Sequence, residues 1–251
     1  MCFKKEIDLK NGILYSIVKP QLRPFDPIFF KGGELVSNSI RTLQQMGNKI
    51  PHSGDFTHVG IVVTSEILDD VHVLPGKTYI WESILGGVLG HGITNIQGKT
   101  FIGVQLRDFD QLIINYDQPN STRIACGHLL RNPLDYEPHD QIKQRFTDFF
   151  RKYDGAIYDF NFYSLLSSLF RCLRPCREPI EEICRTEKWI FCSELVALAY
   201  KHFGVYPSTI NEKNVVPRDI AFPEADHDLM PKVIGELTYI ITPLHAEASP
   251  S

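Results

Sequence analysis

The sequence lacks a hydrophobic run long enough to cross a membrane. A transmembrane helix needs about 20 predominantly apolar residues, and no stretch of this chain approaches that length. Residues 1–12 are polar and charged, so they lack the apolar segment of a signal peptide and the glycine of a myristoylation site. We therefore expect a cytoplasmic protein in a reducing compartment, without a transmembrane segment.

An excess of positive charge is missing as well. The chain has 26 Lys and Arg residues against 30 Asp and Glu residues, which gives a formal net charge of −4. A protein that binds nucleic acid mainly through phosphate contacts needs a surplus of basic residues. We therefore expect no nucleic-acid partner. The hydrophobic content of 43% is ordinary for a globular protein.

The cysteines lack the regular spacing of a disulfide framework or a zinc knuckle. Six cysteines at irregular intervals, in a reducing compartment, predict free thiols. Cys172, Cys176, Cys184 and Cys192 could together bind zinc, but they contain no Cys-x-x-Cys pair. A zinc site there would also consume the cysteine that has the strongest catalytic signal. We expect no metal and no cofactor.

No internal repeat and no low-complexity linker divides the chain, so we predict one domain over residues 1–251, with its core at 25–222. The segment 171–188 is rich in charge and proline, and we interpret it as a loop insertion near the cleft. The expected strands precede most of the expected helices, which is typical of the α+β class.

The expected strands are short and rich in β-branched residues, and the expected helices have apolar residues at helical spacing. The predicted strands or extended segments are 12–22, 26–33, 58–68, 78–83 and 101–108, the last three forming an antiparallel meander. The predicted helices are 34–47, 140–153, 160–173 and 193–204.

Cys192 stands at the start of the last predicted helix, in "WIFCSELVALAY" (189–200). The helical spacing places it on the same face as Leu195 and Val196. The helix N-terminus favours a thiolate, because its N–H groups lack partners and its dipole end is positive. The same N–H groups can stabilise an oxyanion during acyl transfer. Cys192 is therefore a candidate nucleophile.

A catalytic thiolate needs an imidazole beside it and a group that orients this imidazole. His58 begins the predicted strand "HVGIVV", and Glu82 lies at the end of "TYIWES". If 59–63 and 78–82 pair as a hairpin, the start of the first strand lies opposite the end of the second. The pattern thus predicts a Cys192–His58–Glu82 set at one end of a sheet.

The motifs "THVGIVV", "YIWES" and "FCSELVALAY" together resemble the circularly permuted papain-like amidases of the NlpC superfamily. The resemblance is to the YiiX-type branch, which has bacterial and poxvirus members. In unpermuted relatives the cysteine helix precedes the histidine strand, and here the order is reversed. Further matches are "FDPIFFKGG" (25–33), "YDGAIYDF" (153–160) and "VVPRDI" (215–220).

This resemblance implies a barrel-like antiparallel sheet packed against helices, with the nucleophile at a helix N-terminus. It implies that Cys192 is the nucleophile, that His58 is the general base and acid, and that Glu82 orients the imidazole. Tyr158 matches a family tyrosine and would donate its hydroxyl to the oxyanion. A viral source would place the protein in the virion or the host cytoplasm.

Three functions remain open. The first is a thiol hydrolase that acts on an amide or ester bond, whether peptide, isopeptide or lipid-linked. The second is a catalytically silent lipid-binding or scaffold protein with the same fold and peripheral membrane contact. The third is acyl transfer, as in the lecithin–retinol acyltransferase branch, although that branch has "NCEHF" where this chain reads "FCSELV". The oligomeric state is left open.

Each site residue also has a purely structural interpretation. Cys192 could be a buried thiol, His58 a strand-end histidine, Glu82 a solvated carboxylate and Tyr158 a core aromatic residue. The combination of the first three favours the catalytic interpretation. Five further histidines have no evident partner in the sequence, and we expect them to be solvated or structural: His52, His72, His91, His128 and His202.

Overall fold

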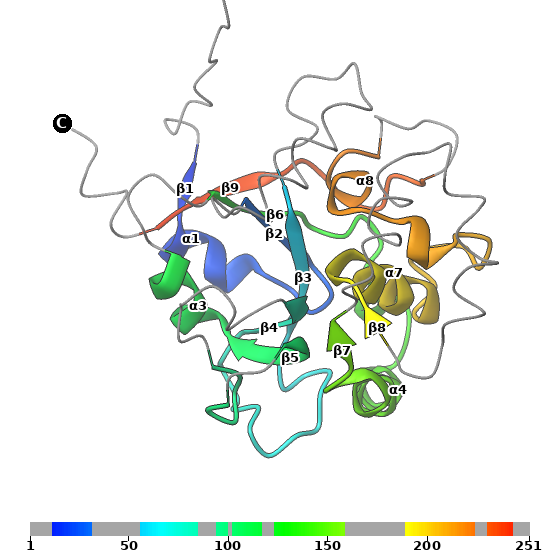
Figure 1. Ribbon diagram of the computed structural model, residues 1–251, viewed down its shortest axis with the longest axis horizontal. Coiled ribbons are helices and arrows are strands. Elements are labelled where there is room, and N and C mark those ends of the chain that lie inside the picture. The colour runs from blue at the N-terminus through cyan, green and yellow to red at the C-terminus, as the bar shows by residue number, and fades with distance from the viewer. Residues whose placement is uncertain are drawn as a thin grey trace, which may run out of the picture.

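The computed structural model describes residues 12–31, 56–84, 94–99, 102–116, 123–158, 189–223 and 230–242. Within these ranges, nine strands form one sheet in the order β1-β9-β6-β2-β3-β4-β5-β7-β8. Helices pack on two sides of this sheet, so the described part of the chain is an α+β structure (Figure 1). The predicted class is confirmed, and the particular family fold stays a prediction.

The centre of the sheet consists of four strands that pair in antiparallel fashion, each with the next. They are β2 (Pro27–Lys31), β3 (His58–Val63), β4 (Tyr79–Ile84) and β5 (Gly103–Asp108). The predicted meander of β3, β4 and β5 is therefore confirmed. Almost every residue of these strands is buried, because both faces of the sheet are covered.

Shorter strands extend the sheet at both sides. Next to β2 lie β6 (Arg123–Cys126), β9 (Thr238–Ile241) and β1 (Ile13–Leu14). Next to β5 lie β7 (Ile157–Tyr158) and β8 (Trp189–Ile190). The β1–β9 and β7–β8 pairs are parallel, so the sheet as a whole is mixed, whereas its central strands pair in the expected antiparallel way.

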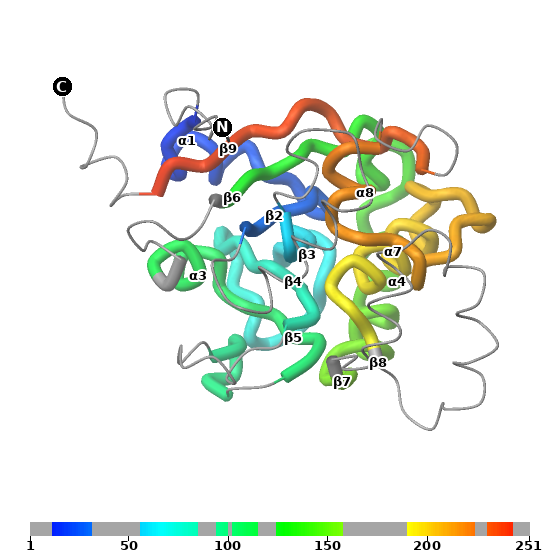
Figure 2. Tube along the Cα trace, turned by 45° about the horizontal axis from the view of Figure 1, so that its top comes forward, coloured from blue at the N-terminus to red at the C-terminus, as the bar shows by residue number. Residues whose placement is uncertain are grey.

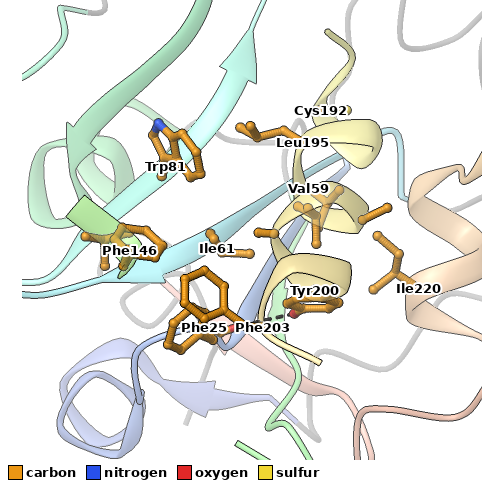
Figure 3. Packing of buried hydrophobic residues seen from close by; sticks show 14 of the residues in the cluster. Phe25, Val59, Ile61, Trp81, Phe146, Cys192, Leu195, Tyr200, Phe203 and Ile220 are labelled. Carbon is orange, nitrogen blue, oxygen red and sulfur yellow. Dashed lines mark hydrogen bonds between the residues drawn. The ribbon is translucent and has the colours of Figure 1, made fainter. Parts of the chain in front are cut away.

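The larger hydrophobic core lies between the sheet and two helices, α4 (His139–Tyr153) and α7 (Cys192–His202). The odd-numbered residues of β3 and β4, such as Ile61 and Trp81, point into this core and meet Phe146 of α4 (Figure 3). Tyr200 of α7 donates a hydrogen bond to the Phe25 carbonyl at 3.0 Å, which fixes α7 against the start of β2. Both predicted helices are confirmed, with ends shifted by one or two residues.

A second, smaller core lies on the opposite face of the sheet, under α1 (Tyr15–Val18) and α3 (Phe109–Tyr116). Figure 2 shows α1 and α3 on one side of the central strands, and α4 and α7 on the other. Two even-numbered residues of these strands, Val62 of β3 and Ile80 of β4, belong to this second core. The two faces of one hairpin therefore contact different helices.

The segment 12–22 was expected to be extended, and this expectation is wrong for most of it. Only Ile13–Leu14 is a strand, and it is followed by α1 and a 3₁₀-helix over Lys19–Gln21. A short apolar run fits a strand and a helix equally well. The helix forms here because Val18 packs into the second core and Tyr15 donates a 2.6 Å hydrogen bond to Asp110 of α3.

Two further 3₁₀-helices cover Pro133–Asp135 and Glu212–Asn214, and the short helix α8 covers Pro217–Ala221. The predicted helices 34–47 and 160–173, the loop 85–92 and the insertion 171–188 lie largely or wholly outside the described residues. Among the helices that the structure describes, none has both the length and the apolar character that a membrane crossing requires.

Candidate active site

His58 is the first residue of β3, at the end of the sheet where β4 finishes. The neighbouring Thr57 N–H donates to the Phe30 carbonyl at 3.0 Å, so the strand entry is fixed to β2. The imidazole lies against the Phe30 ring, with 5.6 Å between the centroids. Its side chain is only 16% exposed. Such a ring has few orientations, and its two nitrogens must find partners inside the protein.

One partner is Glu82, which is fully buried in β4. The pairing of Ile61 with Trp81 puts Gly60 opposite Glu82, so His58 and Glu82 are diagonal neighbours on the same face. Nε2 of His58 lies 2.6 Å from Oε2 of Glu82. A Cβ on Gly60 would lie 3.0 Å from the Glu82 Cβ and 2.6 Å from a methyl carbon of Ile80. Glycine at this position therefore leaves the space in which the pair forms.

The other partner is Cys192, the first residue of α7. This cysteine is only 5% exposed. Cys192 lies close enough to raise the pKa of His58, both by its charge and by a side-chain hydrogen bond. Because Nε2 contacts Glu82, the nitrogen that remains for the sulfur is Nδ1. His58 thus lies between a thiol and a carboxylate, and residues 24, 110 and 134 positions apart along the chain come together.

Two buried hydroxyl groups fix the helix start on which Cys192 lies. Ser83 Oγ of β4 donates to the Ile190 carbonyl at 2.6 Å, two residues before the cysteine. Ser193 Oγ donates to the Val215 carbonyl at 2.7 Å. Both side chains are at most 4% exposed, and each satisfies a carbonyl group that would otherwise be costly to bury. The sulfur is consequently held in place from both sides.

The electrostatics of the set favour a charged imidazole. Burial by itself would lower the pKa of His58, but Cys192 and Glu82 outweigh it and raise this pKa to about 10. For Glu82, burial opposes ionisation, yet Arg107 and then His58 hold the pKa of the carboxyl below its ordinary value. A buried carboxylate that favours the imidazolium is the arrangement expected beside a catalytic histidine.

Arg107 was not identified from the sequence. It lies in β5, is 2% exposed, and places its Nε 2.6 Å from Oε1 of Glu82. The register of β4 with β5 pairs Arg107 with Ile80 and Gln105 with Glu82, so these side chains share one face. The signal was present in "FIGVQLRD", where Val104 and Leu106 alternate with Gln105 and Arg107. Pairing the three expected strands in register would have predicted that Arg107 lies beside Glu82.

The structure describes the backbone of Tyr158 but not its side chain, so its role as an oxyanion donor stays a prediction. Tyr158 pairs with Ile190 across β7 and β8, which brings its backbone beside the strand that leads to Cys192. Glu194, in the first turn of α7, accepts a 3.4 Å hydrogen bond from the Phe191 N–H. Its role there is to cap the helix.

One of the other histidines, His128, has a carboxylate partner that the sequence did not reveal. His128 Nδ1 lies 2.7 Å from Oδ2 of the buried Asp26. His202 stacks on Phe149 with 4.7 Å between ring centroids, and His72 lies in the turn between β3 and β4. His52 and His91 lie outside the described residues, as do Cys172, Cys176 and Cys184.

In the described ranges, no group of three or more His, Cys, Asp or Glu residues is arranged to hold a metal ion. No protein-family model matches the sequence, and a search of the curated proteins finds no match either. The resemblance to permuted papain-like amidases therefore remains a prediction that depends on the motifs. Any function has to be argued from the geometry of Cys192, His58 and Glu82.

Proposed function

We propose that the protein is a thiol hydrolase that cleaves an amide or ester bond through an acyl-enzyme. The observation that carries this proposal is the position of His58, which contacts Cys192 through one ring nitrogen and Glu82 through the other. Nucleophile, base and orienting acid in this order are the parts that acyl transfer by a cysteine requires.

In the proposed mechanism, the Cys192 thiolate attacks the carbonyl carbon of the substrate. The resulting oxyanion is stabilised by the first-turn N–H groups of α7, which have no acceptor within the helix. The carbon–nitrogen or carbon–oxygen bond then breaks, and His58 gives its proton to the leaving amine or alcohol. Water, deprotonated by His58, attacks the thioester, releases the acid and restores the thiol–imidazole pair.

Glu82 keeps the imidazole oriented through this cycle. Its Oε2 contacts Nε2, so the other ring nitrogen is directed at the sulfur. The carboxylate is buried and ionised, which stabilises the imidazolium that forms when the thiol loses its proton. A dry position makes this charge more effective than it would be in water.

The direct test is detection of the acyl-enzyme. The chain is incubated with activated esters and with peptidyl and fatty-acyl amides, and the covalent adduct is located by peptide mass spectrometry. We expect an acyl group on Cys192, turnover that is lost in Cys192→Ala, and unchanged turnover in Cys126→Ala. Cys126 is the matched control because it is also a buried free cysteine.

Other outcomes would replace the proposal by one of its alternatives. An adduct that passes to an added alcohol or amine faster than to water would make the protein an acyltransferase. The absence of any adduct, combined with a lipid that copurifies with both the wild type and Cys192→Ala, would make it a lipid-binding protein. The substrate panel separates peptide-type from lipid-type bonds.

A further inference from the structure

Arg107 is a buried cation on the face of the sheet that carries the second core, here called its inner face, one strand beyond Glu82. Its side chain is 2% exposed, and the carboxylate it faces is fully buried. The contact between its Nε and Oε1 of Glu82 is 2.6 Å. This contact is an ion pair without hydrogen-bond geometry, and among the described residues none of the three guanidinium nitrogens has a hydrogen-bond partner. The guanidinium is thus placed for a single anion, not for a network of acceptors.

Such a residue is costly for folding, because a buried ion pair is seldom better than apolar residues of the same size. The side chains that share its neighbourhood, Ile80 and Val62, are apolar. The cost is understandable if the cation serves the site. We infer that Arg107 is a positioning residue, which keeps Glu82 ionised and directed at His58 on the inner side of the sheet. This inference rests on the proposed function of the site.

The groups of the site form a continuous series of contacts from β5 to α7. Arg107 faces Oε1 of Glu82, Oε2 of Glu82 faces Nε2 of His58, and the other ring nitrogen faces Cys192. The charged groups that most affect the pKa values of Glu82 and His58 all belong to this series. Burial would otherwise favour the protonated carboxyl, which cannot stabilise an imidazolium.

The direction in which the pKa of His58 changes when Arg107 is replaced distinguishes an action through Glu82 from a direct action of Arg107 on His58. Removing a nearby cation makes His58 easier to protonate. A direct effect of Arg107 on His58 therefore predicts a higher titration midpoint of the His58 ring in Arg107→Met. If Arg107 acts through Glu82, the carboxyl becomes protonated in this variant and the His58 midpoint falls. We expect a fall of at least about one pH unit.

The experiment follows the His58 ring signal by NMR as a function of pH, together with the rate of Cys192 alkylation by iodoacetamide. In the Glu82→Gln background, Arg107→Met should no longer lower the midpoint, because the group through which it acts is gone. Arg107→Lys, which keeps the cation, should restore most of the wild-type midpoint. Lys19→Met is the matched control, since it removes one positive charge whose partner is Asp110; it should leave the His58 midpoint unchanged.

A midpoint that rises or stays constant in Arg107→Met overturns the inference, as does an equal fall in the Glu82→Gln background. If Arg107→Met does not fold, Arg107→Gln replaces it with the same expected sign. The titration does not depend on turnover. A lowered midpoint without acyl-enzyme formation would refute the proposed function alone, whereas acyl-enzyme formation with an unchanged midpoint would refute the role of Arg107 alone.

Discussion

Two histidines in the described part of the chain pair with buried carboxylates, and they differ in what lies on the other side of the ring. Nε2 of His58 contacts Glu82 at 2.6 Å, and Nδ1 of His128 contacts Asp26 at 2.7 Å. His58 is 16% exposed and also contacts a thiol, whereas the side chain of His128 is 42% exposed. The histidine–carboxylate contact is common to both, so it does not by itself define a reactive site.

The carboxylates differ as well. Asp26 accepts hydrogen bonds from the Arg23 and Leu129 N–H groups, at 3.0 Å each, so it fixes the chain around β2 and β6. Glu82 is opposed by a buried arginine instead. Backbone donors make Asp26 a structural group. Glu82 instead lies between two side chains that can be positively charged, Arg107 and His58.

The nearby thiols complete the comparison. Cys126 of β6 is fully buried, and burial followed by the charge of Asp26 raises its pKa to about 12. Such a thiol is almost never ionised near neutral pH. Cys192, by contrast, begins a helix and lies beside an imidazole, so the two described cysteines have different surroundings.

The largest expected difference concerns the two histidines. His58→Ala should slow alkylation of Cys192 at pH 7 by roughly 100-fold or more, because the base that generates the thiolate is lost. His128→Ala should change the same rate less than about twofold. Site-resolved mass spectrometry of the iodoacetamide adducts measures both, with Cys126 as an unreactive internal reference. Equal rates in the two variants would contradict the proposed pair.

A smaller effect is expected when each carboxylate loses its charge. Glu82→Gln should lower the pKa of His58, because an anion that favours the imidazolium is removed, and slow Cys192 alkylation by about tenfold, the equivalent of one pKa unit. Asp26→Asn should lower the pKa of His128 and leave that of His58 unchanged. NMR titration of both rings tests this. A fall of both midpoints in either variant would show that the two pairs are coupled.

The smallest expected effect comes from the glycines next to the two pairs. A Cβ on Gly60 would lie 3.0 Å from the Glu82 Cβ and 3.0 Å from the Trp81 carbonyl oxygen, neither of which can move freely. A Cβ on Gly127 would meet mainly the Ile234 side chain, at 2.9 Å. Both substitutions to alanine should destabilise the protein by about 1–3 kcal/mol.

Only Gly60→Ala should also reduce the alkylation rate of Cys192, by a few-fold. Thermal unfolding gives the stability change, and the alkylation rate gives the effect on the site. A loss of rate in Gly127→Ala equal to that in Gly60→Ala would mean that reactivity follows general stability, not the position of Glu82.

Much of the site could be predicted because it depends on local patterns. The alternation in 58–63 and 78–83 predicts a hairpin, and a hairpin brings its first and last residues together, so the contact between His58 and Glu82 follows. The N-terminal position of Cys192 follows from the helical spacing after it. The family resemblance and the hydrolase function remain predictions that no comparison tests.

The remainder required tertiary information. The contact of Arg107 with Glu82 could be recognised only from the register of a third strand, β5. Short strands such as Arg123–Cys126 carry too little pattern to be recognised alone, and the helix at Tyr15–Val18 forms because it has a core to cover. His128 found Asp26 across 102 residues, a pairing that no spacing rule predicts.

One consequence of the parallel contact between β7 and β8 concerns what fixes the nucleophile. Tyr158 and Ile190 lie side by side in adjacent strands, and Ser83 of β4 holds the Ile190 carbonyl at 2.6 Å. The backbone two residues before Cys192 is therefore tied to two other strands of the sheet. Substitutions in the sheet can thus shift the sulfur even where helix α7 itself is unchanged.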